Sequence, residues 1–286
     1  MIVTSEDRVV VAGLTGGQGS FWSERMREYG TNVVGGISAS KAGTTHLGVP
    51  VLGSFAEAAG EVGVDVGVLF VPPVAARPLA IDAIDSGVRT LVILTEFIPV
   101  HDTIEIVHAA RDAGCAVVGP NTAGIVTPGE AFAGFMPAFN DRIFKVGDVG
   151  VVSRSGSLGT LACMELTRAG RGQSAFIGIG GDPVSGTSTR DALAALDAHA
   201  ATKAIVLIGE IGGSKEEDAA EYAASMSKPI AAFIAGRAAP KGRKMGHAGA
   251  LVVGDKGTWD SKHAALTEAG VTVVDVPSAL PSALAG

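Results

Sequence analysis

Short apolar runs alternate with amphipathic stretches along the whole chain. The runs are rich in valine and isoleucine, as in Val9–Ala12, Val66–Val71 and Ala204–Ile208. Continuous apolar runs of this length are typical of parallel strands that are buried on both faces of a sheet. Because helical patterns separate the runs, the chain is predicted to have an α/β architecture with parallel sheets.

The pattern predicts two series of elements with a similar layout. In the first series we expect strands over 9–12, 32–36, 66–71, 90–95 and 115–118, and helices over 19–29, 54–61, 75–86 and 102–113. In the second we expect strands over 149–153, 174–178, 203–208, 229–234 and 271–275, and helices over 157–169, 187–198, 214–225 and 258–269. Two helix starts have the spacing of a capping box, Ser54 with Glu57 and Ser214 with Glu217. The prediction is two doubly wound α/β domains of comparable size.

The stretch Gly119–Gly147, which has three prolines and little periodicity, separates the two series. We interpret it as a loop-rich connector. The expected boundaries are a first domain over 1–122, a connector over 123–147 and a second domain over 148–286.

Composition narrows the class of protein. The chain has 286 residues, of which 47% are hydrophobic and 18% charged, as buried parallel strands would require. A net charge of -7 argues against a general nucleic-acid binder, and no apolar run approaches the ~20 residues that cross a bilayer. No signal peptide is visible, and with Cys115 and Cys163 alone a disulfide framework is not expected. We expect a cytoplasmic protein with no membrane or nucleic-acid partner.

A glycine-rich turn, Gly13–Gly19, follows the first predicted strand and leads into a helix. Its glycines allow a tight turn and the close approach of a pyrophosphate to the helix start. An NAD-binding fold would add an acidic residue at the end of the second strand, but Asn32–Gly36 contains none. Lys41 follows instead and suits an extra phosphate, which favours coenzyme A (CoA) or NADP. Spacing does not separate these two, and a turn that serves packing alone remains the alternative.

The second series opens with a similar turn, in which Ser153, Ser155 and Gly156 offer donors to a phosphate at a helix start. The Gly-x-Ser-x-Gly pattern of serine hydrolases is absent. Glu210 lies just beyond an apolar strand, on the side of an open α/β sheet where ligands bind. Its carboxylate can accept a hydrogen bond from an imidazole and so select the ring nitrogen that attacks. The alternative is a surface glutamate in a glycine loop.

One histidine, His247, lies among small residues just after Lys241, Arg243 and Lys244. Three cations and a histidine on a Gly/Ala-rich segment suit a group that accepts a phosphoryl, because the cations offset the charge of its oxygens. A solvated basic loop with an incidental histidine is the other interpretation.

Together these segments resemble the α subunit of succinyl-CoA synthetase (succinate–CoA ligase) along nearly the whole chain. The matching segments are Gly13–Gly19, Gly43–Gly48, Gly119–Asn121, Thr127–Glu130, Ser153–Gly156, Gly178–Pro183, Ile208–Gly213, and Ala239–Gly242 with Gly246–Gly249. The resemblance implies an N-terminal Rossmann-like CoA-binding domain and a C-terminal flavodoxin-like ligase domain. It also implies an enzyme of the tricarboxylic acid cycle that forms acyl-CoA reversibly from a carboxylic acid, CoA and a nucleoside triphosphate.

The resemblance also assigns roles to residues. His247 is implied to be the phosphohistidine, which passes its phosphoryl to the carboxylate before the CoA thiol displaces phosphate, and Glu210 to orient it. Contacts with CoA are implied for Thr15, Gly16, Gly17, Gln18, Lys41, Leu94, Thr95 and Glu96. Contacts with the phosphate are implied for Ser153, Arg154, Ser155 and Gly156.

The chain has no Walker-type phosphate loop. In the family, ATP or GTP and its Mg²⁺ bind to an ATP-grasp β subunit. We therefore expect a hetero-oligomer, no metal site on this chain, and no turnover by this chain alone.

Two departures from the family pattern concern the acid. Thr160 replaces the tyrosine that the family places at the carboxylate, Leu161 replaces the neighbouring acid, and Thr122-Ala123 stands where Cys-Pro is usual. Succinate remains the first candidate, and a hydroxydicarboxylate such as malate or citrate is the alternative. A non-catalytic CoA-binding protein is disfavoured because His247 and Glu210 are retained together. An NADP oxidoreductase is disfavoured because no proton-transfer pair accompanies the first glycine turn.

Overall fold

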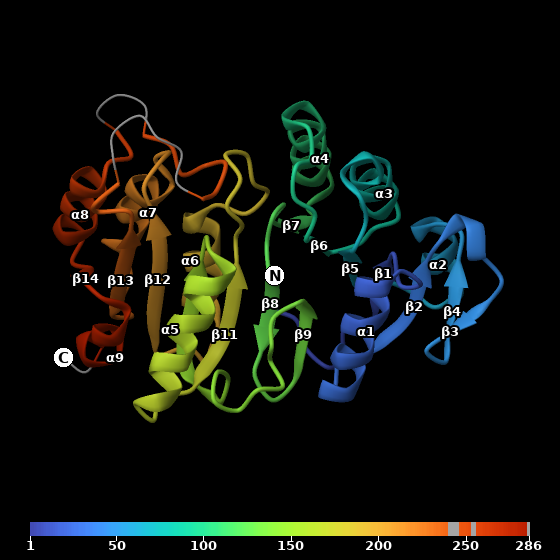
Figure 1. Cartoon of the computed structure of the whole chain (residues 1–286), viewed down its shortest axis with the longest axis horizontal. Coiled ribbons are helices and arrows are strands. Elements are labelled where there is room, and N and C mark those ends of the chain that lie inside the picture. Colours follow the sequence, from blue (N-terminus) through green and yellow to red (C-terminus); the bar gives the residue numbers. More distant parts are fainter. Residues whose placement is uncertain (240–245, 253–255, 285–286) are drawn as a thin grey trace. The chain divides into compact units, whose positions relative to one another are not determined.

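The computed structural model describes residues 1–239, 246–252 and 256–284, and it divides into two compact units (Figure 1). The first unit contains Met1–Phe139 and Val184–Gly186. The second contains Asn140–Pro183 and Thr187–Gly286. Within the described part, no helix is both long and apolar enough to cross a membrane.

The first unit is built on a sheet with the order β3-β4-β2-β1-β5-β6-β7. Its strands are β1 Val9–Ala12, β2 Val33–Ile37, β3 Thr45–His46, β4 Val49–Leu52, β5 Val66–Leu69, β6 Thr90–Ile93 and β7 Ala116–Val118. Its helices are α1 Gly17–Tyr29, α2 Phe55–Glu61, α3 Pro73–Asp85 and α4 Val100–Ala113, with a 3-10 turn over Ala39–Lys41. Without the short antiparallel β3, the strands run 3-2-1-4-5-6 in chain order, which is the order of a Rossmann fold. The Rossmann-like prediction is confirmed.

The stretch predicted as a loop-rich connector contains a buried hairpin. Strand β8 (Gly124–Thr127) pairs antiparallel with β9 (Ala131–Gly134). The Thr31 hydroxyl donates to the carbonyl oxygen of Phe132 at 2.9 Å and accepts from its N–H at 3.0 Å, which ties the hairpin to the end of α1. These strands of four residues are buried on both faces and show no alternation, so periodicity did not reveal them.

The second unit carries parallel strands in the order β14-β13-β12-β10-β11. Its strands are β10 Val146–Ser153, β11 Gln173–Gly178, β12 Ala204–Glu210, β13 Ile230–Ala235 and β14 Thr272–Val274. Its helices are α5 Gly156–Arg168, α6 Thr189–Ala198, α7 Lys215–Ala223, α8 Trp259–Glu268 and α9 Leu280–Ala283, with a 3-10 turn over Pro277–Ala279. In chain order the strands run 2-1-3-4-5 from β11 to β14, the flavodoxin-like order that was predicted.

Candidate active site

The candidate site lies where the strand order of the second unit reverses. Strand β10 lies between β11 and β12, so the chain passes from β10 to β11 on one side and then to β12 on the other side of β10. Ser153 at the end of β10 is in register with Ile208 of β12, and Glu210 ends β12 two residues further on. Ligands of open α/β sheets bind at such switch points, beyond the carboxyl ends of the strands.

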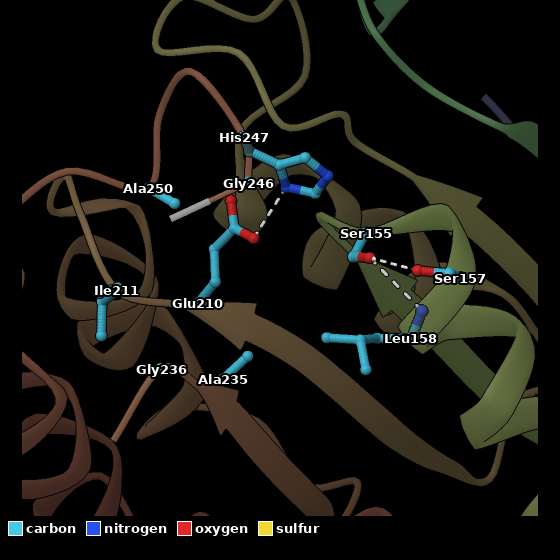
Figure 2. A pocket seen from close by; sticks show the side chains of 10 residues that line it. All are labelled: Ser155, Ser157, Leu158, Glu210, Ile211, Ala235, Gly236, Gly246, His247 and Ala250. Carbon is cyan, nitrogen blue, oxygen red and sulfur yellow. Dashed lines mark hydrogen bonds and ion pairs between the residues drawn. The ribbon is translucent and has the colours of Figure 1, made fainter. Parts of the chain in front are cut away.

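His247 and Glu210 form a hydrogen-bonded pair at this position. His247 Nδ1 lies 2.8 Å from Glu210 Oε2 (Figure 2), with the two side chains 31% and 9% exposed. Because an ionised carboxylate only accepts, Nδ1 carries the proton and donates it, which leaves a lone pair on Nε2. Figure 2 shows that second ring nitrogen on the side of the ring away from Glu210. The pair therefore presents Nε2 as a nucleophile.

Arg154 lies beneath Glu210 and is 3% exposed. Its Nη2 is 3.2 Å from Glu210 Oε1, and its Nη1 donates to the carbonyl oxygens of Glu210 at 3.1 Å and Gly212 at 3.0 Å. Nη1 also lies 3.2 Å from Glu216 Oε1. Arg154 thus neutralises buried carboxylates and holds the β12–α7 turn in place.

The ion pairs continue from Glu216 into α8. Glu216 pairs with Lys262, and Lys262 Nζ lies 3.0 Å from Glu217 Oε2. Burial alone would raise the pKa of the Glu216 carboxyl, but the Arg154 and Lys262 cations hold that pKa below its ordinary value. Glu216 therefore stays ionised at neutral pH and keeps both cations in position.

Glycine residues leave the space that His247 and its segment occupy. A Cβ on Gly181 would lie 2.5 Å from His247 Cγ, so only glycine leaves room for the ring there. The Gly249 N–H donates to the Gly181 carbonyl oxygen at 3.0 Å, and a Cβ on Gly212 would lie 2.1 Å from the Gly249 oxygen. The segment that carries His247 therefore packs directly on the turns after β11 and β12.

Helix α5 begins opposite the pair. Ser155 is its N-cap and accepts from the N–H of Leu158 at 3.3 Å, while the buried Ser153 hydroxyl donates to the Ser155 carbonyl oxygen at 2.6 Å. A cavity of about 330 Å³ lies between this helix start and the pair. It is lined by Ser155, Ser157, Leu158, Glu210, Ile211, Ala235, Gly236, Gly246, His247 and Ala250. A nucleophilic imidazole facing a helix N-terminus is suited to accept a phosphoryl, because the helix end favours the charge of the phosphoryl oxygens.

The structure brings together Ser155, Glu210 and His247 among the residues predicted for this site. Gly156 opens α5, and Ser153 and Arg154 support the site from beneath without lining the cavity. Lys241, Arg243 and Lys244, which the sequence placed near His247, lie outside the described residues. No three His, Cys, Asp or Glu side chains of the described residues are grouped so as to hold a metal ion.

Several contributing residues were not expected from the sequence. They are Ser157 in the cavity wall, Gly181 under the imidazole, and Lys215, Glu216 and Lys262 in the buried charge cluster. The burial of Lys262 could not be predicted from the sequence, because a lysine on a predicted amphipathic helix normally faces solvent. Gly181 lies in the matching segment Gly178–Pro183, but its contact with residue 247 depends on tertiary structure.

A second cavity, of about 310 Å³, lies in the first unit. It is lined by Gln18, Leu69, Phe70, Val71, Pro72, Leu94, Thr95 and Phe135, and so contains three of the residues predicted to contact CoA. Thr15, Gly16, Gly17 and Glu96 are outside its lining, and Lys41 is exposed on the turn after β2.

The first glycine turn serves both packing and access. A Cβ on Gly19 would lie 2.1 Å from the Gly13 oxygen, and a Cβ on Gly13 would lie 2.2 Å from the Phe70 oxygen. Packing by itself therefore requires glycine at these two positions. At Gly17 nothing lies within 4 Å of a Cβ, so the start of α1 is open to a ligand.

The two threonines predicted near the acid are found in different units. Thr122 is buried in the first unit, where its hydroxyl oxygen accepts from the Gly124 N–H at 3.0 Å. Thr160 belongs to α5 in the second unit, where its hydroxyl donates to the Gly156 carbonyl oxygen at 2.8 Å.

Comparison with known families supports the two-part reading of the chain. Residues 4–97 match the CoA binding domain family, and residues 152–272 match the CoA-ligase family. The first match lies within the first unit and the second covers the carboxyl ends of β10 and β12.

Relatives extend the similarity to nearly the full chain. The succinate–CoA ligase [ADP-forming] α subunit of Methanothermobacter thermautotrophicus is 48% identical over 281 residues, covering 98% of this chain and 94% of that protein. A subunit of the ADP-forming sulfoacetate–CoA ligase of Bilophila wadsworthia is 42% identical over 291 residues, covering 100% and 99%. ATP citrate lyase of Methanothrix soehngenii has the same fold, with a TM-score of 0.89 at 23% identity over 99% of this chain and 50% of that one. The chain therefore belongs to the family of ADP-forming succinate–CoA ligase α subunits.

Proposed function

We propose that this chain is the α subunit of an ADP-forming carboxylate–CoA ligase in which His247 carries the phosphoryl group from ATP to the acid. The observation that supports it most is the His247–Glu210 pair, with 2.8 Å between Nδ1 and Oε2, facing the start of α5. Family membership supplies the class of reaction, and this geometry supplies the acceptor.

In the first step the Nε2 lone pair of His247 attacks the terminal phosphorus of ATP, and the bond between that phosphorus and the ADP oxygen breaks. Glu210 accepts the Nδ1 hydrogen bond throughout and offsets the positive charge that develops on the ring. The N-terminus of α5 stabilises the charge on the phosphoryl oxygens.

In the second step a carboxylate oxygen of the acid attacks phosphorus, and the P–N bond to His247 breaks. The ring returns to the tautomer that donates from Nδ1 to Glu210. The CoA sulfur then attacks the acyl carbon, the bond between that carbon and the phosphate oxygen breaks, and the thiol proton leaves with the phosphate, which gives the thioester. A carboxylate is a poor acyl donor until its oxygen leaves as phosphate, so a covalent carrier divides one difficult reaction into easier steps.

We assign CoA to the first unit. The cavity with Gln18, Leu94 and Thr95 lies at the carboxyl ends of β5 and β6, beside the open start of α1. Thr15, Gly16 and Gly17 form that helix start, where the Gly16 N–H already donates to the Gly13 carbonyl oxygen at 2.9 Å and Gly17 is open to a ligand, and Glu96 follows Thr95. Exposed Lys41 suits the phosphate on the ribose of CoA.

The nucleotide is proposed to bind a partner subunit, because the relatives are α subunits and this sequence has no Walker-type loop. That partner is an ATP-grasp β subunit, and its Mg²⁺ shields the phosphate charges of the nucleotide. ATP is favoured over GTP because the relatives are ADP-forming. Two buried free cysteines suit the reducing cytoplasm.

Succinate is the first candidate for the acid, since several relatives are succinate–CoA ligase subunits. A hydroxydicarboxylate such as malate or citrate is the second candidate. It is supported by Thr160, whose short side chain bonds within its own helix and leaves more room than a tyrosine would.

The test is transfer of labelled phosphate from [γ-³²P]ATP to this chain in the presence of its partner. We expect one acid-labile, alkali-stable phosphate per chain, and none in His247→Asn. His101→Asn, which removes an exposed histidine on α4, is the matched control and retains the label. Label that persists in His247→Asn would overturn the proposal.

A further inference from the structure

Lys215 is a half-buried cation that the chemistry above does not use. It is the first residue of α7, and its Nζ donates to the Asp182 carbonyl oxygen at 2.9 Å. A cation in the first turn opposes the helix dipole, whereas the following acids, Glu216, Glu217 and Asp218, match it. Local helix preference therefore does not explain a lysine here, and the long-range contact with residue 182 does.

Asp182 belongs to the turn on which His247 rests. Gly181 lies directly under the imidazole, and its carbonyl oxygen accepts from the Gly249 N–H at 3.0 Å. A displacement of residues 181 and 182 would therefore move both the ring and the segment that carries it.

Glu210 is the last residue of β12 and leads into the other turn, five residues before Lys215. The Arg154 guanidinium fixes this turn from below through the carbonyl oxygens of Glu210 and Gly212. The two members of the His247–Glu210 pair thus depend on two separate turns, and the Lys215 ammonium joins those turns.

We propose that Lys215 is a positioning residue, which ties the turn under His247 to the turn that carries Glu210 and thereby sets the distance between Nδ1 and Oε2. The effect of Lys215 on phosphoryl transfer rests on the function proposed above, whereas its effect on the distance between Nδ1 and Oε2 does not.

Charges from several elements act on Lys215. Burial, and then the Arg154 cation, lower its pKa from the ordinary 10.5 to about 8, against the opposing effect of Glu216, Asp182 and Glu210. Above that pH the ammonium becomes an amine, which donates a weaker hydrogen bond to the Asp182 carbonyl. We therefore expect the rate of His247 phosphorylation to fall as the pH rises through about 8.

The first test needs no activity. In Lys215→Met we expect hydrogen exchange at the Gly249 amide to accelerate at least about tenfold, because its acceptor on residue 181 is released. The ¹⁵N shifts of His247 should move from a single Nδ1–H tautomer towards the mixture of a solvated histidine. Lys215→Arg, which keeps a donating cation, should restore both signals.

Lys228→Met is the matched control. Lys228 is also a half-buried lysine that donates to backbone carbonyls, those of Leu196, Asp197 and His199. It precedes β13 and so lies at the amino ends of the strands, whereas the candidate site lies at their carboxyl ends. It should leave the Gly249 and His247 signals unchanged. Wild-type exchange and wild-type ¹⁵N shifts in Lys215→Met would overturn the proposal.

The second test is the pH profile of His247 phosphorylation with the partner present. We expect a falling limb near pH 8 in the wild type, a rate at least about tenfold lower without that limb in Lys215→Met, and a limb displaced to higher pH in Lys215→Arg. An unchanged limb in Lys215→Met would overturn the proposal. A wild type that takes no phosphate refutes the proposed function, while the exchange measurement still decides the role of Lys215.

If circular dichroism shows that Lys215→Met does not fold, the wild type supplies the answer. Gly249 exchange, corrected for the intrinsic effect of pH, should lose protection as the pH rises from 7 to 9. Constant protection over that range would overturn the proposal.

Discussion

Residue 181 determines whether the His247 ring can occupy its place. The ring lies so close to the Gly181 Cα that any β carbon would overlap it, while Glu210 accepts the hydrogen bond from Nδ1 of the imidazole. The sequence predicted from the strand end that Glu210 could accept a hydrogen bond from an imidazole, and the family resemblance implied that this imidazole is His247. It did not predict Gly181, because nothing local links residue 181 to residue 247.

The contacts of Arg154 likewise could not be predicted from the sequence. The family resemblance implied that Arg154 contacts a phosphate, but its guanidinium is buried against Glu210 and Glu216. Side-chain direction depends on which strand lies next to β10, and that is decided by the sheet order.

Gly181→Ala should lower the rate of His247 phosphorylation at least about tenfold. The new methyl would lie 2.5 Å from His247 Cγ, so the ring must leave Glu210, at a cost of about 1–3 kcal/mol in overpacking. The rate is measured by single-turnover labelling with [γ-³²P]ATP and the partner.

The control for this substitution is Gly60→Ala. Gly60 lies in α2, where nothing is within 4 Å of a Cβ, so alanine should raise stability by about 1 kcal/mol and leave labelling unchanged. Normal labelling of Gly181→Ala would show that the ring tolerates displacement.

At the scale of elements, tertiary contacts overrode one of the predicted helix caps. Ser54 accepts from the Glu57 N–H at 3.1 Å as expected of an N-cap, although the Glu57 carboxylate accepts from the Gly53 N–H at 2.6 Å and does not complete the capping box. Ser214 makes no cap bond. Glu217 instead accepts from the Gly257 N–H at 3.0 Å and pairs with Lys262. The capping-box prediction at Ser214 was therefore wrong, because a buried partner competed for its glutamate.

The buried ion pairs join α7 to α8 and predict a large loss of stability when one charge is removed. Lys262→Met should lower the free energy of unfolding by about 3–5 kcal/mol, since it leaves Glu216 buried without its nearer cation. The pKa of Glu216 is below its ordinary 4.5, so this contribution exists at neutral pH and is lost as the pH falls below 4.5. Urea unfolding at pH 7 and pH 4 measures both effects.

Lys203→Met is the reference for the Lys262 substitution. Lys203 is exposed before β12, so its replacement should change the free energy of unfolding by no more than about 0.5 kcal/mol. Equal effects of the two substitutions would contradict a stabilising role of the buried pairs.

Across the whole molecule, both units place their candidate site by the same rule. In each sheet the first strand lies between two neighbours, and the chain runs first to the neighbour on one side and later to the neighbour on the other. In each unit a turn that contains glycine or serine leads from that first strand into a helix. A cavity lies at the carboxyl ends of the strands in each unit, and neither contains a Walker-type loop.

This division of sites predicts that the isolated chain will not make acyl-CoA from ATP, an acid and CoA. Turnover should appear when the β subunit is added, because the nucleotide then has a site. Coupled ADP release with succinate, malate and citrate measures both the requirement and the preferred acid.

The control reaction contains the partner with His247→Asn and should remain inactive. Turnover by the isolated chain would refute the two-subunit proposal. Preference for succinate by orders of magnitude would refute the hydroxydicarboxylate alternative, and preference for malate or citrate would support it.

The sequence by itself determined the order of the main elements and the two sheets, because the spacing of apolar residues and glycine turns reflects local structure. It also placed Glu210 at a strand end and Ser155 at a helix start, whereas the role of His247 as phosphoryl carrier stays a prediction that the family resemblance implies. Only the tertiary structure decided the buried β8–β9 hairpin, the place of Arg154 under Glu210, and the contacts of Gly181 and Lys215. Those depend on which strands lie side by side, which brings residues 181, 210 and 247 together although they are far apart along the chain.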